Sequence, residues 1–517
     1  MRKNILILVT IAFRLLSSLC FAASWGDLGN GRYANPVLNA DYSDPDVIRV
    51  GDKYYMVCSD FHFIGMPVLE STDMVNWKII SQVYDSFDYP GWDEMKRYAG
   101  GSWAPAIRHH DGFYYIYFCT PDEGLFMTTA TDPHGPWSKL HLLKEVKKWE
   151  DPCPFWDEDG NAYLVRSQYG AGPIILHRMS ADGKELLDEG TVIYEGPVAE
   201  GPKMHKMDGI YYISLPEGGV RGGWQTMLRS DSIYGPYDRK VVLETGSTSI
   251  NGPHQGAIVD TPDGEWWFYH FQEVPPLGRV VHLQPMTWKD SWPLIGIDYD
   301  GNGVGEPVAQ WRKPIPGHEP SYPQSSDSFD GATLGLQWQA NHRFIHENIY
   351  FDRKKGWLSL TASKGDSLRN APNTLVQKMM GEHGRVTVKL DFSDMKNGQK
   401  AGLACLAKKH KGLGVMIDDN HPMLYIEDCG KDTEIVQLDG NEVHLRVDLD
   451  AEENAHKFSY STDGICYREV GIPFEMIWGS WKGPRIGIYS YSPVDDAGIA
   501  YFDDFIYELL PSGTSVN

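Results

Sequence analysis

The chain has 517 residues, of which 42% are hydrophobic and 23% charged, and its formal net charge is −23. This length predicts at least two domains, each with its own core. The acidic balance disfavours nucleic acid and anionic membrane surfaces as partners, because both would be repelled. It is compatible with an uncharged ligand and does not identify one.

Residues 1–22 are predicted to form a signal peptide. Arg2 precedes the apolar stretch 5–13, and the small residue Ala22 offers a cleavage point. Arg14 interrupts the apolar run, whereas a transmembrane helix needs about 20 apolar residues. We therefore expect an exported protein without a membrane span, located in the periplasm or, alternatively, secreted.

A phrase of turn residues followed by alternating aromatic and aliphatic residues recurs roughly every 50 residues, a period typical of repeat folds. Turn residues before such a strand are a strong hairpin signal. Five copies without a long helical pattern between them predict a five-bladed β-propeller over residues 30–316. Chance similarity within an array of β-sandwiches is the alternative. The copies are GDKYYMVCS (51–59), DGFYYIYFC (111–119), DGNAYLVRS (159–167), DGIYYISLP (208–216) and DGEWWFYHF (263–271).

The repeats stop after Trp311, and the following stretch, 312–326, is rich in Pro and Ser and is interpreted as a linker. Beyond it, alternating patterns such as RVTVKLDF (385–392) and RIGIYSY (485–491) predict strands. They favour a two-sheet β-sandwich over residues 327–512. The predicted fold class is therefore all-β, a propeller followed by a sandwich.

Three acidic residues stand just before predicted blades: Asp44 in DYSDPDV, Asp151 in WEDPCPF and Glu200 in AEGPKMH. Each is followed by Pro, directly or after one Gly. Equivalent positions of successive blades converge on a propeller axis, so these carboxyl groups are expected to face one another. Glycosidic cleavage needs one protonated and one ionised carboxyl group, and a third can hold the proton on the first. For any one acid alone, turn capping or pairing with a basic side chain is the alternative.

These three segments, together with GGSWAPAI (100–107) and LGRVVHLQPMTWKDSWP (277–293), resemble the signatures of glycoside hydrolase family 43. The likeness extends from Asn35 to Pro316. The part from Asp327 onward resembles the concanavalin-like β-sandwich of the family's β-xylosidase and α-L-arabinofuranosidase members. The resemblance implies a neutral plant oligosaccharide or polysaccharide as substrate and inversion of the anomeric centre.

The resemblance also implies a role for each acid. Asp44 matches the general base that activates water, Glu200 the general acid, and Asp151 the residue that modulates the pKa of its partner. Asp41 and Asp46 compete with Asp44 for the role of base. Asp44 is preferred because it precedes Pro, as the base of the family does.

Further positions match residues that contact the sugar in the family. Arg279 matches an arginine that reaches the cleaved sugar, and Trp103 and Phe61 match aromatic positions of the pocket. Some members carry a His beside a central calcium ion or water at the start of the fifth blade. Here NGPHQGAIV places Gln255 at that position and His254 one residue earlier. Either side chain is a candidate for the pocket. No cofactor is expected to be required. Binding of a calcium ion on the propeller axis is an alternative that the sequence leaves open.

Together with the resemblance, the sequence favours an exo-acting, inverting α-L-arabinofuranosidase that releases terminal non-reducing residues from plant cell-wall side chains. The alternative is a β-xylosidase acting on xylo-oligosaccharides. The segments SDFHFIGMP (59–67) and PHQG (253–256) depart from the form associated with xylosidases and therefore favour the first. A non-catalytic carbohydrate-binding protein is the alternative from another class, and the presence of all three acids argues against it.

Overall fold

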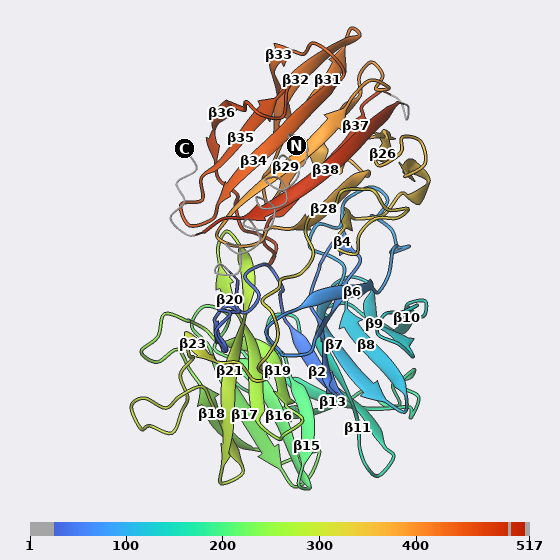
Figure 1. The fold of residues 1–517 in the computed structure, drawn as a ribbon. Coiled ribbons are helices and arrows are strands. Elements are labelled where there is room, and N and C mark those ends of the chain that lie inside the picture. The colour runs from blue at the N-terminus through green and yellow to red at the C-terminus, as the bar shows by residue number, and fades with distance from the viewer. Residues whose placement is uncertain (1–24, 495–497, 512–517) are drawn as a thin grey trace, which may run out of the picture.

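The computed structural model describes residues 25–494 and 498–511, which form a β-propeller and a β-sandwich stacked on it (Figure 1). The predicted signal peptide, residues 1–22, lies outside the described residues. In the part of the chain that is described, no helix combines the length and the apolar character needed to cross a membrane. The predicted all-β fold class is confirmed.

The propeller consists of five four-stranded antiparallel sheets, whose strands follow one another along the described chain except that β4 is left out of the first blade. The first blade contains β2 (Asp46–Val50), β3 (Lys53–Val57), β5 (Pro67–Ser71) and β6 (Lys78–Gln82), and the second β7 (Trp103–His110), β8 (Phe113–Cys119), β9 (Gly124–Ala130) and β10 (His141–Glu145). The third contains β11 (Trp149–Trp156), β12 (Ala162–Gln168), β13 (Ile174–Met179) and β14 (Thr191–Tyr194). The fourth contains β15 (Lys203–Met207), β16 (Ile210–Glu217), β17 (Trp224–Ser230) and β18 (Asp238–Leu243), and the fifth β19 (His254–Asp260), β20 (Trp266–Val274), β21 (Gly278–Lys289) and β22 (Trp292–Ile295).

Each recurring phrase of the sequence forms the second strand of a blade. These strands are buried along most of their length, as β8 illustrates with six buried residues after Phe113. Neighbouring blades cover both faces of each sheet, which explains the large apolar residues at successive positions. The first strands contact one another around the axis, β19 with β2, β2 with β7, β7 with β11 and β11 with β15. β1 (Arg32–Ala34) pairs with β23 (Gln310–Arg312) and so joins the two ends of the propeller.

The sandwich has two sheets. One runs in the order β33 (Lys431–Gln437), β32 (His421–Asp428), β31 (His410–Asp418), β30 (Lys400–Leu406), β37 (Arg485–Ser492), β28 (Thr374–Lys378), β24 (Gln339–Asn341) and β4 (Phe63–Ile64), with β27 (Ser363–Lys364) beside β37. The other runs β25 (Ile349–Tyr350), β26 (Leu358–Thr361), β38 (Ile499–Leu509), β29 (His383–Asp391), β34 (Glu442–Asp450), β35 (His456–Ser461) and β36 (Arg468–Phe474). Two short 3-10 helices, η2 (His346–Asn348) and η3 (Leu368–Asn370), lie in its connections.

The two domains share one sheet and one set of buried charges. β4, which belongs to the first blade's connection, pairs with β24 of the sandwich. Arg485 of the sandwich lies 3.0 Å from Asp41, and Lys378 lies 2.6 Å from Asp60. All four side chains are almost fully buried, and breaking such a pair leaves an uncompensated charge. The sandwich is therefore firmly attached to the end of the propeller where Asp44 lies.

Candidate active site

Each blade enters its first strand through the same local turn. One residue there has a positive φ in all five blades: Asp44 (54°), Ala104 (40°), Asp151 (57°), Gly201 (58°) and Gln255 (41°). Pro follows in the first four blades and Gly in the fifth. In the second, third and fifth blades the strand register shifts at this point, as in a β-bulge. A bulge re-aims side chains, so that two consecutive residues can reach the axis instead of alternating.

We call these five residues the turn positions and the residues directly before them the flanking positions. Asp44 and Asp151 occupy turn positions, whereas Glu200 occupies a flanking position because Gly201 forms the turn. The expectation that the three acids share one blade position is therefore wrong by one residue for Glu200. Their convergence is nevertheless observed, because Asp44, Asp151 and Glu200 all line one cavity. The flanking residues are Ser43, Trp103, Glu150, Glu200 and His254.

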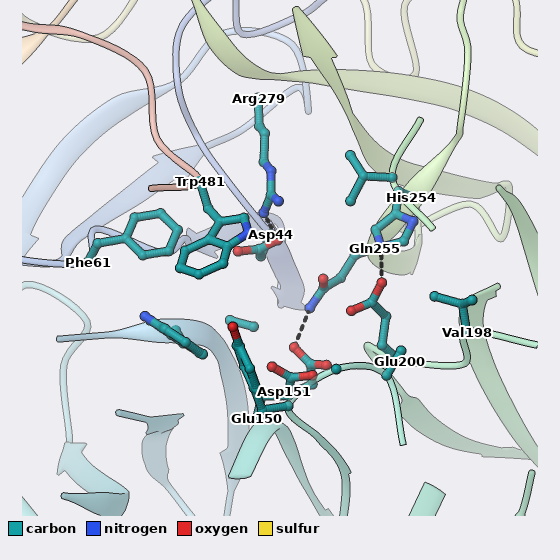
Figure 2. A pocket seen from close by; sticks show the side chains of 16 residues that line it. Asp44, Phe61, Glu150, Asp151, Val198, Glu200, His254, Gln255, Arg279 and Trp481 are labelled. Carbon is teal, nitrogen blue, oxygen red and sulfur yellow. Dashed lines mark hydrogen bonds and ion pairs between the residues drawn. The ribbon is translucent and has the colours of Figure 1, made fainter. Parts of the chain in front are cut away.

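A cavity of ≈ 370 Å³ lies on the axis, on the side that faces the sandwich. The eight residues predicted to form the site all line it (Figure 2). The other lining residues were not predicted. The predicted ones are Asp44, Phe61, Trp103, Asp151, Glu200, His254, Gln255 and Arg279, and the others Ala104, Glu150, Tyr169, Gly170, Ala171, Val198, Val220 and Trp481.

The two competitors of Asp44 lie elsewhere. Asp41 accepts hydrogen bonds from the guanidinium of Arg485 and from the backbone N–H of Arg279. Asp46 accepts from the guanidinium of Arg108 at 2.6 Å, further along the axis. Neither lines the cavity, so Asp44 is the acid of this segment that can reach a ligand.

Asp44 is held by two donors. Arg279 Nη1 donates to Oδ1 at 2.9 Å, and the hydroxyl of Ser59 donates to Oδ2 at 2.6 Å. The Arg279 guanidinium also lies 4.6 Å from the centre of the Phe271 ring, which helps fix its orientation. The hydrogen bond from Arg279 is charge-assisted, and the two donors together fix the orientation of both carboxylate oxygens.

Asp151 accepts three hydrogen bonds, from the hydroxyl of Ser167 at 2.5 Å, the backbone N–H of Gly201 at 2.8 Å and Nε2 of Gln255 at 3.0 Å. Burial and the nearby charge of Glu200 nevertheless raise the pKa of this carboxyl. Gln255 thus points inward and fixes one oxygen of Asp151.

Glu200 lies against His254, whose Nε2 is 3.0 Å from Oε1 of the carboxyl group. Burial pushes the pKa of Glu200 upward, but the hydrogen bond and charge of His254 and the charge of Arg279 outweigh it, so the net shift is downward. The expected upward shift at Glu200 is therefore not found in the free protein. The raised groups are its neighbours Asp151 and Glu150.

Comparison with known families matches the model of glycosyl hydrolases family 43 to residues 33–293. The chain belongs to glycoside hydrolase family 43. A second model, described as the beta xylosidase C-terminal concanavalin A-like domain, matches residues 326–508. The resemblance stated from the sequence motifs is confirmed, and the chain is a glycoside hydrolase that acts on carbohydrate.

Three relatives illustrate the similarity of the chain to known proteins. The chain is 56% identical to a putative beta-xylosidase of Xylanibacter ruminicola, over 90% of this chain and 87% of that protein. It is 37% identical to a beta-xylosidase of Formosa agariphila, over 94% and 92%. It is 28% identical to a non-reducing end alpha-L-arabinofuranosidase, BoGH43B, of Bacteroides ovatus, over 76% and 77%.

Glu150 is the main residue of this family 43 site that the sequence analysis missed. It occupies the flanking position of the third blade, equivalent to Glu200 in the fourth and His254 in the fifth. One oxygen each of Glu150, Asp151 and Glu200 lie within 4.8 Å of one another. Burial, and then the charges of Asp151 and Glu200, raise the pKa of Glu150 to about 9. The signal was present in the recurring triplets SDP, WAP, EDP and EGP, whose first residues share this position.

Two aromatic residues were also missed. Trp481 comes from the sandwich, in the connection between β36 and β37, and its ring centre lies 5.4 Å from that of Trp103. Tyr169, at the end of β12, lies 5.8 Å from Trp103. Together with Phe61 they form an aromatic wall, a surface suited to the C–H face of a sugar ring. No local pattern marks Trp481, because its role depends on how the second domain docks.

The residues further along the axis do not suit a calcium ion. Calcium takes six to eight oxygen ligands. Here the carboxylate of Asp46 lies 2.6 Å from Arg108 and 3.8 Å from the buried ammonium of Lys203. Two cations already surround this carboxylate, and a divalent ion beside them would be repelled. At the turn position of the fifth blade, the Gln255 amide donates to Asp151.

Proposed function

We propose that this chain is an exo-acting, inverting β-xylosidase that releases xylose from the non-reducing end of xylo-oligosaccharides. The observation that carries the proposal is a cavity lined by both Asp44 and Glu200 in different surroundings. Asp44 pairs with a guanidinium, whereas Glu200 lies against His254 and near two other carboxyl groups. The cavity volume of ≈ 370 Å³ is near the lower end of ligand pockets, roughly 300–1,000 Å³. A small pocket supports removal of one terminal sugar at a time.

The proposed roles follow the geometry. Glu200 donates a proton to the glycosidic oxygen as the bond breaks. Asp44 takes a proton from a water molecule that attacks the anomeric carbon from the opposite face, so the centre is inverted in one displacement. Asp151, fixed by three hydrogen-bond donors, orients the side of the pocket that contains Glu200, which we call the acid side. The opposite side, which contains Asp44, is the base side. Arg279 holds Asp44 and is placed to contact sugar hydroxyls.

The names of the relatives support xylose over arabinofuranose. The two relatives at 56% and 37% identity are named for β-xylosidase activity, and the arabinofuranosidase stands at 28%. This reverses the order of preference reached from the sequence. An α-L-arabinofuranosidase is the second candidate, supported by that relative and by the segments 59–67 and 253–256.

Turnover of 4-nitrophenyl β-D-xylopyranoside and 4-nitrophenyl α-L-arabinofuranoside tests the proposal. We expect kcat/KM for the xyloside to exceed that for the arabinofuranoside. Proton NMR should show α-xylose as the first product. Faster turnover of the arabinofuranoside would favour the second candidate, and no turnover of either would favour a carbohydrate-binding protein without catalysis.

Export and a plant-derived substrate belong to the same proposal. The N-terminal pattern of residues 1–22 supports an exported protein, in the periplasm or secreted. Cell fractionation tests the location. Release of xylose from xylo-oligosaccharides of plant xylan, followed by chromatography, tests the substrate. Activity confined to the cytoplasm would contradict export, and failure to release xylose would contradict the plant-derived substrate.

A further inference from the structure

Three carboxyl groups lie close together on the acid side, and two of them have proposed roles: Glu200 as the general acid and Asp151 as the residue that orients it. Glu150 has no task among them. Because Asp151 has a φ of 57° and the strand register shifts between Glu150 and Cys153, these consecutive acids do not point to opposite faces of β11. Both line the cavity, and Figure 2 shows them side by side below Glu200.

One oxygen of each carboxyl group lies no more than 4.8 Å from the others. A point can therefore lie within about 2.8 Å of all three, which is the normal length of an O–H···O hydrogen bond. A water molecule or a sugar hydroxyl at this point can contact Glu150, Asp151 and Glu200 together. An oxygen that carries hydrogen can accept a proton from one of these groups and donate one to another.

Glu150 differs from the other carboxyl groups of the cavity in its partners. Asp44 has Arg279, Glu200 has His254, and Asp151 has three hydrogen-bond donors. The stabilising influence on an ionised Glu150 is the backbone N–H of Ala171, whereas burial and the charges of Asp151, Glu200 and Asp44 all oppose ionisation.

The other ionisable groups around Glu150 do not change this balance. Burial raises the pKa of the Cys119 thiol on β8, and the charges of Asp151 and Glu150 raise it further. The thiol therefore stays neutral. On β12, the guanidinium of Arg166 lies over the Trp149 ring at 3.5 Å and donates to His177. Tyr169 faces Trp103. Glu150 is thus the acid of the cavity best placed to carry a proton at neutral pH.

We propose that Glu150 is a positioning residue that stores the proton delivered by Glu200 and passes it through the oxygen bound between them. The inference rests on the proposed role of Glu200 as general acid. In the free enzyme Glu200 is ionised beside His254 and the proton resides on Glu150. The proton affinity of each group depends on the charge of the others, so they titrate as a unit and the proton can move between them without changing the total charge.

The proton transfers balance over one turnover. Glu150 gives its proton to the bound oxygen, which gives one of its own to Glu200. Glu200 passes that proton to the glycosidic oxygen as the C–O bond breaks. Asp44 accepts a proton from the attacking water, whose oxygen forms the new bond to the anomeric carbon. Asp44 then releases its proton to solvent and Glu150 takes one up, which restores the starting state.

The test compares Glu150→Gln with Glu185→Gln, an exposed residue of the same blade, over a range of pH. Two substrates of whichever sugar the enzyme accepts are used: a 2,4-dinitrophenyl glycoside, whose departure needs no proton, and a disaccharide, whose departure does. For the disaccharide, we expect Glu150→Gln to move the alkaline limb of kcat/KM about one pH unit lower and to cost about 10-fold at pH 8. For the dinitrophenyl glycoside we expect a change of less than about twofold. Glu185→Gln should match the parent enzyme on both.

Equal losses on the two substrates, or an unmoved pH profile, would overturn the inference, because a merely structural role predicts those results. Glu200→Ala keeps the two proposals apart. If Glu200→Ala harms the disaccharide far more than the dinitrophenyl glycoside and Glu150→Gln does not, only the storage role fails. If Glu200→Ala harms both equally, the assignment of the general acid fails and the storage role with it.

A readout without turnover guards against a variant that folds poorly. Infrared difference spectra of the parent enzyme minus Glu150→Gln at pH 7 should show the C=O band of one protonated carboxyl group. Spectra that instead show a lost carboxylate band would mean that Glu150 is ionised, which overturns the inference. Matching melting temperatures of the two proteins establish that the comparison is between folded states.

Discussion

The two sides of the cavity contain the same kind of side chain and treat it in opposite ways. On the base side, Asp44 is paired with Arg279 at 2.9 Å. On the acid side, one carboxylate oxygen each of Glu150, Asp151 and Glu200 lie within 4.8 Å of one another, and His254 lies beside Glu200. Neighbouring carboxyl groups resist ionising together, and after burial this repulsion raises the pKa of Glu150 and of Asp151. The surroundings of each acid therefore determine its task.

The two sides also differ in origin. The acid side is built from the third, fourth and fifth blades. The sandwich stabilises the base side through Arg485, which donates a hydrogen bond to Asp41. Asp41 in turn accepts a hydrogen bond from the backbone N–H of Arg279. The hydroxyl of Ser43, next to Asp44, donates to the carbonyl of Trp481 at 3.3 Å. The second domain thus helps to position residues that line the cavity.

Replacing the base should have the largest effect. Asp44→Asn keeps the size of the side chain but removes the proton acceptor, so we expect kcat to fall by about 10²–10⁴-fold. The loss should be the same for good and poor leaving groups, because water activation is needed for both. Asp52→Asn, on an exposed turn of the same blade, is the control. A loss confined to poor leaving groups would show that Asp44 acts on the acid side.

Removing the cation that distinguishes the base side should cost less. Arg279→Met deletes the charged hydrogen bond to Asp44 and keeps much of the apolar volume over Phe271. A hydrogen bond to a charged group is worth about 1.5–3 kcal/mol, so kcat/KM should fall by about 10- to 100-fold. Arg221→Met, with a side chain 80% exposed, serves as the control in the same assay. An unchanged kcat/KM would mean that Asp44 does not depend on this pair.

The fold and most of the site were predictable because both are repeated in the sequence. The five copies of one phrase became β3, β8, β12, β16 and β20. The turn before each blade likewise recurs, which brings Asp44 and Asp151 to one axis. The one-residue offset of Glu200 was missed because Gly201, which adopts the positive φ readily, replaces the acid at the turn.

What the sequence did not reveal depends on contacts between distant segments. Glu150 looked like ordinary charge beside Asp151, since consecutive strand residues normally face opposite sides, and only the bulge turns both inward. Trp481 reaches the cavity through the docking of the sandwich on the first blade. A pattern of local residues carries no information about such packing.

Removing the side chain of Trp481, the sandwich residue that lines the cavity, should have a moderate effect. Trp481→Ala removes part of the aromatic wall beside Trp103, and stacking contacts of this kind are worth about 0.5–1.5 kcal/mol beyond the buried area. We expect KM for xylo-oligosaccharides to rise by roughly 3- to 10-fold with a smaller change in kcat. Ile465→Ala, at a sandwich residue 83% exposed, should leave KM unchanged. A fall in kcat with constant KM would indicate that Trp481 acts on the chemistry instead.

Chelation should have the smallest effect, and it sharpens the comparison most directly. The difference between the two sides requires that no divalent ion sits among the three carboxyl groups, since such an ion would hold them all ionised and leave no proton to share. The axis beyond them already carries Arg108 and Lys203 around Asp46. We therefore expect dialysis against EDTA, followed by assay with and without added calcium, to change kcat/KM by less than about twofold, because the positive charges come from side chains. A large loss that calcium restores would mean that a metal ion supplies the charge on the axis, and the acid side would then have to work by metal coordination rather than by shared protons.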